Sequence, residues 1–149
     1  MVDADKNSSD YTQYMLDRLE EVHAFTDNLD NNKNLCIIGG FDYLYDTIFD
    51  TENSDILEKC SNIISSCAQN NIWVQNYSLK LHPLRFMNIV LKSEKMSTKV
   101  AAFAALSSLV RGLNMDIKRK FIDVDGVEYL LCLLKDEKYS IKLRTKVMS

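Results

Sequence analysis

The chain has 149 residues, of which 46% are hydrophobic and 26% charged, proportions typical of a folded globular domain rather than a disordered segment. It contains only four glycines and one proline, too few turn residues for a sandwich or barrel of many short strands, so an all-β fold is excluded. The formal net charge of -3 at pH 7 disfavours binding to the phosphate backbone of a nucleic acid.

No apolar run approaches the roughly 18 residues needed to cross a bilayer, so no membrane partner is expected. Residues 1–10 are polar and predict a tail rather than a secretion signal. The four cysteines show neither a C-x-x-C pair nor the density of a secreted scaffold, which favours a reducing, cytoplasmic compartment. Because the chain ends inside a helical pattern, we expect a fragment. The endoplasmic reticulum lumen stays open as a location if a signal peptide has been removed.

Apolar residues recur every three or four positions over 11–29, which predicts an opening helix with Ser9 or Asp10 as its N-cap. A short Asn-rich break is expected after this helix. The pair Gly39-Gly40 then predicts a tight turn, because glycine adopts the left-handed backbone that ends a helical turn. Residues 11–33 are therefore expected to form a cap at the start of the fold.

The elements after this turn recur along the chain. A middle helix is expected over 41–50, followed by a polar loop and a longer helix from Ser54. The string Ile-Ser-Ser at 64–66 aligns with Leu-Ser-Ser at 106–108, an offset of 42. A further offset of 44 aligns His82-Pro83 with Gly126-Val127. Such self-similarity is typical of proteins built from stacked repeats.

Three units follow from this alignment, each with a short helix, a tight turn, a middle helix and a long third helix. Periods of 42 to 44 residues are typical of armadillo repeats. We therefore predict an all-α, armadillo-like right-handed α-solenoid of about three repeats with an N-terminal capping helix, in a single domain over 11–149. The repeats are expected at about 34–72, 73–114 and 115–149, the last one truncated, with third helices that begin near Ser54, Ser97 and Ser140.

The residues that usually carry catalysis or bind metals are sparse. The two histidines, His23 and His82, have no second metal ligand nearby in the sequence, so no metal site is expected. His82 is interpreted as a turn residue and His23 as a half-exposed residue of the first helix. Cys60 and Cys67 lie two helical turns apart, roughly 10 Å, beyond disulfide reach, and are interpreted as small core residues. No phosphate-binding loop and no nucleophile–base set occurs, so we predict neither a cofactor nor enzymatic activity.

One face of the third helices is predicted to bind a protein partner. Solenoids hold other proteins on extended concave surfaces of this kind. The alternative is that these residues are ordinary solvated helix positions. The row consists of Asn62, Ser66, Gln69, Asn70, Phe103, Ser107 and Arg111.

Several strings resemble the heat-shock protein 70 binding-protein family, the armadillo-type nucleotide exchange factors of the heat-shock protein 70 (Hsp70) chaperones. The most specific are the Gln-Asn-Asn ending of Ser66–Asn71 and the Leu-Val-Arg ending of Lys99–Arg111. Further similar strings are 27–36 with Gly39-Gly40-Phe41, Val74-Gln75, and Phe121 with Asp125-Gly126. The resemblance covers about 16–149.

This resemblance implies a co-chaperone whose concave face binds the nucleotide-binding domain of Hsp70 and promotes ADP release. It implies contact roles for the matching third-helix residues, which are Ser66, Gln69, Asn70, Ser107 and Arg111. Arg111 is the favoured anchor, because a guanidinium can bind a carboxylate through two parallel hydrogen bonds. Nothing in 1–10 matches the family's client-releasing segment. The alternative function is a generic armadillo scaffold that binds an extended peptide or protein without affecting nucleotide exchange.

Overall fold

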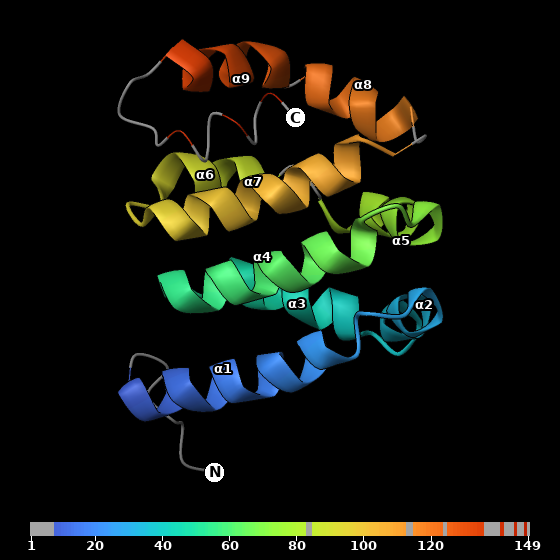
Figure 1. The fold of residues 1–149 in the computed structure, drawn as a ribbon, viewed down its shortest axis with the longest axis vertical. Helices are drawn as coiled ribbons and strands as arrows, with labels where there is room; N and C mark the ends of the chain where they lie inside the picture. The colour runs from blue at the N-terminus through green and yellow to red at the C-terminus, as the bar shows by residue number, and fades with distance from the viewer. Residues whose placement is uncertain are drawn as a thin grey trace.

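The computed structural model describes residues 8–82, 85–112, 115–123 and 125–135, together with positions 141, 145 and 148 (Figure 1). Within these ranges the regular structure is helical and contains no strand, which confirms the predicted all-α class. The helices are α1 Ser9–Ala24, α2 Leu29–Ile37, α3 Gly40–Asp50, α4 Ser54–Ala68, α5 Ile72–Ser78, the 3₁₀ turn η1 Leu79–Leu81, α6 Arg85–Lys92, α7 Met96–Val110, α8 Met115–Asp123 and α9 Gly126–Lys135.

The helices are stacked in layers along the long axis of the molecule (Figure 1). Helix α1 packs on α4, α4 packs on α7, and α7 contacts α8, which in turn packs on α9. The short helices α2 and α5 contact each other at one edge of the stack. The order short helix, middle helix, long helix occurs in α2–α3–α4 and again in α5–α6–α7. The stack therefore places the two longest of these helices, α4 and α7, side by side.

The turn before each middle helix contains one residue with left-handed backbone. These residues are Gly39, His82 and Asp125, with φ of 84°, 53° and 58°. They lie 43 positions apart along the chain. The prediction paired His82 with Gly40 and with Gly126, whereas the structure makes Gly39 and Asp125 its equivalents, one position earlier in each case. The interpretation of His82 as a turn residue is confirmed.

The start of the chain differs from the prediction. Helix α1 ends at Ala24 instead of continuing to 29, and the Asn-rich segment forms helix α2 rather than a break. The reason is capping: Oδ1 of Asn28 accepts a hydrogen bond from the backbone N–H of Asp30 at 2.8 Å and so begins a new helix. The N-cap of α1 is Ser8, not Ser9 or Asp10. Residues 1–7 and the third-helix start expected near Ser140 lie outside the described residues.

Helices α4 and α7 share the largest helix–helix contact, and apolar side chains fill it. Ile63, Ile64, Leu106 and Leu109 are at most 1% exposed. Three alanines of α7, Ala101, Ala102 and Ala105, are buried as well. Cys60 and Cys67 are buried in the same core, which confirms that they are core residues; Cys36 is also buried.

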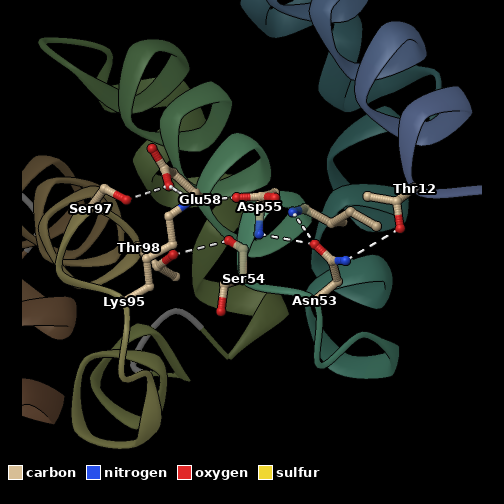
Figure 2. Close-up of polar contacts among 9 residues, drawn as sticks. Thr12, Asn53, Ser54, Asp55, Glu58, Lys95, Ser97 and Thr98 are labelled. Carbon is tan, nitrogen blue, oxygen red and sulfur yellow. Dashed lines mark hydrogen bonds and ion pairs between the residues drawn. The ribbon is translucent and has the colours of Figure 1, made fainter. Parts of the chain in front are cut away.

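Polar contacts fasten the N-terminal ends of α4 and α7 to each other (Figure 2). Oγ1 of Thr98 donates a hydrogen bond to the carbonyl oxygen of Ser54 at 3.0 Å. The ammonium group of Lys95 pairs with the carboxylate of Asp55 and lies 3.3 Å from that of Glu58. Thr98 itself is buried, whereas the side chains of the ion pairs are partly exposed and each pair contributes little alone. Together these contacts fix how far one helix can slide along the other.

A second polar network fastens α1 to α4. Nδ2 of Asn53 donates to Oγ1 of Thr12 at 3.3 Å (Figure 2). Farther along, the Lys59 ammonium nitrogen lies 3.0 Å from Nδ1 of His23, and Nε2 of His23 lies 3.1 Å from Oγ of Ser66. Because the ammonium group can only donate, Nδ1 accepts and Nε2 carries the proton towards Ser66. The imidazole of His23 is therefore neutral in this arrangement, and it is half-buried as predicted.

Replacing Leu106 with alanine tests the register of α7. Leu106 is 1% exposed in the core, so Leu106→Ala is expected to lower the free energy of unfolding by about 2–5 kcal/mol. Denaturant unfolding followed by circular dichroism measures this loss. Leu29→Ala is the matched control, because Leu29 is 61% exposed and its truncation should cost little. Equal effects of the two substitutions would contradict the described packing.

The network around His23 predicts a pH dependence of stability. Burial, and next the charge of Lys59, hold the pKa of His23 below its ordinary value of 6.5. The folded chain then binds fewer protons than the unfolded chain, so acid favours unfolding. We expect the contribution of His23 to be constant above about pH 7.5 and to fall as the pH drops through 6.5 towards the lower folded pKa.

Chemical denaturation between about pH 8 and pH 5.5 measures this dependence. His23→Gln removes the titrating ring and should flatten the pH profile of the free energy of unfolding. His82→Asn is the control, because His82 is exposed and asparagine tolerates its left-handed backbone. A wild-type slope in the His23→Gln variant would show that His23 is not the group responsible for the pH dependence.

Candidate functional site

A hollow of about 340 Å³ lies where the C-terminal ends of α4 and α7 come side by side. Its lining consists mainly of uncharged polar groups, with one arginine and one exposed isoleucine. It is therefore suited to hydrogen bonding with a partner's surface rather than to enclosing an apolar ligand. The lining residues are Ser65, Gln69, Asn70, Ile72, Gln75, Ser107, Ser108, Arg111 and Gly112.

The end of α4 supplies one side of this hollow. Gln69 is the C-cap of α4, and its backbone N–H donates to the carbonyl oxygen of Ser65 at 3.1 Å. Asn70 follows with left-handed backbone, φ 55°, a conformation that asparagine tolerates better than most residues. Asn71 then caps α5, because its Oδ1 accepts from the backbone N–H of Val74 at 3.2 Å. This tight turn leaves the side chains of Gln69 and Asn70 exposed at the rim.

The end of α7 supplies the opposite side. Arg111 is the exposed C-cap of α7, and its backbone N–H donates to the carbonyl oxygen of Ser107 at 3.0 Å. The hydroxyl groups of Ser65 and Ser108 lie 3.0 Å apart and join the two helices across the hollow. The guanidinium of Arg111 gives this lining its positive charge.

Gln75 on α5 lies beneath both helix ends and was not expected in the site. Its Nε2 donates to the carbonyl oxygen of Ala68 at 2.9 Å and to that of Ser108 at 3.1 Å. These carbonyl groups belong to the last turns of α4 and α7. Carbonyl groups at the end of a helix lack hydrogen-bond partners within their own helix. Gln75 therefore links the two helix ends. In the sequence it is a polar residue that directly follows Val74, a side chain that the structure buries.

The structure brings four of the seven predicted site residues together in the hollow: Gln69, Asn70, Ser107 and Arg111. Asn62 and Ser66 lie on α4 outside this lining, and both are half-buried. Ser66 instead contacts His23 of α1. Six of the seven predicted residues thus separate into a cluster of four at the helix ends and two on the body of α4.

The placement of Phe103 on the partner-facing surface is wrong. Phe103 is 4% exposed and belongs to the hydrophobic core. Helix α7 is covered by α4 on one side and by α6 on another, so little of its body reaches solvent. Spacing along one helix could not reveal this, because the neighbouring helices decide which part of a face is covered.

A larger hollow of about 540 Å³ lies between the end of α3 and helix α6. Its lining includes Phe49, Asn88 and Lys92, but none of the predicted site residues. The hollow at the ends of α4 and α7 is therefore the candidate site because of its residues, not because of its size.

The two core cysteines are not poised as nucleophiles. Burial raises the pKa of the Cys60 and Cys67 thiols to about 12, so both stay protonated and unreactive near neutral pH. No group of three or more metal-ligating side chains occurs in the part of the chain that the structure describes. Among the same residues, no helix combines the length and hydropathy needed to span a membrane.

Comparison of the sequence with known proteins shows the family of the chain. Residues 31–149 match the family model described as the SIL1/FES1/HPBP1 C-terminal domain. Over 128 residues, or 85% of its length, the chain is 24% identical to Hsp70-binding protein 1 of Rattus norvegicus and of Homo sapiens. It spans only 36% and 35% of those relatives, about a third of their length. Because the family model covers most of the sequence, the chain belongs to the SIL1/FES1/HPBP1 C-terminal domain family.

Proposed function

We propose that this chain is an Hsp70 co-chaperone module that binds the chaperone's nucleotide-binding domain and promotes ADP release. The observation that carries the proposal is the meeting of Gln69, Asn70, Ser107 and Arg111 in one hollow. These residues come from two segments 42 positions apart, and both their spacing and the family resemblance predict them as contact residues. Relatives in the same family are named Hsp70-binding protein 1.

The proposed architecture is an armadillo-like right-handed solenoid, with α2–α3–α4, α5–α6–α7 and α8–α9 as successive repeats in one domain over 11–149. The contact of α4 with α7 and the recurring left-handed turn residues support this assignment. In a solenoid each repeat buries its apolar face only against its neighbours. The long third helices would then line the concave face, with the hollow at one edge of it.

Recognition would rest on hydrogen bonds at the rim of the hollow. The guanidinium of Arg111 can bind a carboxylate of the chaperone through two parallel hydrogen bonds. The exposed amides of Gln69 and Asn70 each offer donors and an acceptor. Ser107 has a small side chain, so a partner can approach α7 closely. Together these groups would hold one lobe of the nucleotide-binding domain.

Exchange would follow from this grip. If the chain holds one lobe while its body crowds the other, the nucleotide cleft is favoured in a more open state that binds ADP weakly. The chain then lowers the affinity of Hsp70 for ADP by some factor. ADP lowers the affinity of Hsp70 for the chain by the same factor, since coupling between two binding sites is reciprocal. The competing proposal, a scaffold that grips an extended peptide on the same face, predicts no such coupling.

Arg111→Ala tests the proposed anchor. We expect it to weaken binding to the nucleotide-binding domain by about 1–3 kcal/mol, because an exposed arginine that meets a carboxylate commonly dominates an interface. The melting temperature should stay nearly unchanged, since the side chain lies outside the core. Isothermal titration with nucleotide-free Hsp70 domain measures the affinity.

Arg18→Ala is the matched control for this variant. Arg18 is exposed on α1 and lines a different, apolar hollow beside Ile38. Its loss should leave affinity at the wild-type level. If Arg111→Ala binds as tightly as Arg18→Ala, then Arg111 is not part of the interface.

The exchange activity itself is tested by the release of fluorescent ADP from purified Hsp70 with and without this chain. We expect faster release, together with weaker binding of the chain when ADP is saturating. The scaffold alternative predicts an unchanged release rate and equal affinity with and without ADP. That result would contradict exchange activity while keeping a role in binding.

A further inference from the structure

Three short helices each begin with an exposed apolar side chain. Leu29 is the first residue of α2, Ile72 of α5 and Met115 of α8. Their side chains are 61%, 47% and 56% exposed, and the three positions lie 43 residues apart along the chain. A single exposed apolar residue is ordinary, but this one recurs at the same position of three successive helices. We call these three residues the apolar edge.

Helix capping does not account for the apolar edge. The caps of α2 and α5 are Asn28 and Asn71, whose side chains accept hydrogen bonds from backbone N–H groups. An apolar brace at a helix start pairs the residue before the cap with the fourth residue of the helix. In α5 these two positions hold Asn70 and Gln75, which are polar. Neither the cap nor such a brace therefore requires an apolar first residue.

The apolar edge lies beside the candidate site. Helices α2, α5 and α8 lie on the side of the stack towards which α4 and α7 run at their C-terminal ends (Figure 1). Ile72, the middle residue of the edge, is itself part of the lining of the hollow, together with Gln69 and Arg111. Packed helices lie about 8–10 Å apart, so three successive layers span roughly 20 Å. The apolar edge therefore continues from the hollow into both neighbouring layers.

A stable interface needs more apolar surface than the predicted contact residues in the hollow provide. Interfaces of ordinary size bury about 800 Å² on each partner, and they combine an apolar centre with polar groups around it. All four of these contact residues are polar or charged: Gln69, Asn70, Ser107 and Arg111. The apolar edge supplies the missing apolar part directly beside them.

We propose that Leu29, Ile72 and Met115 bind an apolar patch on the nucleotide-binding domain of Hsp70, next to the carboxylate that Arg111 binds. A partner seated in the hollow contacts Ile72 and reaches the other two residues by extending along the stack. The hollow would then orient the partner through hydrogen bonds, while the apolar edge adds affinity by removing apolar surface from water. This inference rests on the proposed function, because it takes the Hsp70 domain as the occupant.

The test replaces all three residues with glutamine, which is polar, uncharged and similar in length. Because the three side chains are largely exposed, the melting temperature of the triple variant Leu29→Gln, Ile72→Gln, Met115→Gln should stay near the wild-type value. Its affinity for the nucleotide-free Hsp70 domain, measured by isothermal titration, should fall by about tenfold or more. The matched control is Ile37→Gln with Ile122→Gln, since these side chains are 61% and 60% exposed but lie towards the opposite ends of α2 and α8. The control should keep wild-type affinity.

The heat-capacity change of binding gives a second readout. Burial of apolar surface makes this change negative. Titrations at several temperatures should therefore give a less negative value for the triple variant than for the wild-type chain and the control. Ile72→Gln alone should change the affinity and the heat capacity in the same direction by a smaller amount, so the test does not depend on the triple variant folding.

The outcomes separate the inference from the proposed function. If the wild-type chain binds the Hsp70 domain and the triple variant binds as tightly as the control, the apolar edge is outside the interface and the proposed function stands. If the triple variant instead abolishes a dimer of the wild-type chain in analytical ultracentrifugation and keeps its affinity for Hsp70, the occupant is a second copy and the inference is overturned. If the wild-type chain does not bind Hsp70 in any nucleotide state, the proposed function and the inference fail together. A selective loss of affinity with a less negative heat-capacity change supports the inference.

Discussion

The packing of α4 against α7 is the contact on which the rest of the structure depends. Its centre is apolar, with Ile64 and Leu106 almost fully buried. One end is fastened by Thr98 on the Ser54 carbonyl group, and the other by the Ser65–Ser108 pair. Because both ends are fixed, the C-terminal ends of the two helices stop at the same level. The hollow exists because these ends coincide, and a one-turn slip of about 5.4 Å would separate its two sides.

The turn after α4 shows how one string serves both fold and site. In the sequence Gln-Asn-Asn, Asn71 begins the next helix and Asn70 adopts the left-handed backbone. These roles explain much of the string without any partner. The consequence of the turn is that Gln69 and Asn70 project at the rim, where helix α7 brings Arg111. The same few residues therefore shape the backbone of the turn and form part of the proposed interface. For substitutions at these positions, both the stability of the chain and its affinity for the partner must be measured.

Much of the helical order followed from the sequence, since apolar spacing and left-handed turn residues are local signals. The periodic strings at Ser65-Ser66 and Ser107-Ser108 also predicted which helices would lie side by side. The errors arose where local signals are ambiguous or tertiary packing decides. The Asn-rich segment forms a helix because Asn28 caps it, and Phe103 is buried because α4 and α6 cover α7. The role of Gln75 could not be predicted, because its partners at Ala68 and Ser108 lie 7 and 33 positions away and meet it only in the folded chain.

The central claim is that the partner binds at the ends of α4 and α7, and site-specific photo-cross-linking tests it most directly. A photoreactive phenylalanine analogue would replace Gln69 at the rim of the hollow in one sample, and Asn88 of the larger hollow beside α6 in another. Both side chains are exposed, so neither replacement disturbs the core. We expect a cross-link to the nucleotide-binding domain of Hsp70 from position 69 and none from position 88. A cross-link from position 88 alone would contradict it.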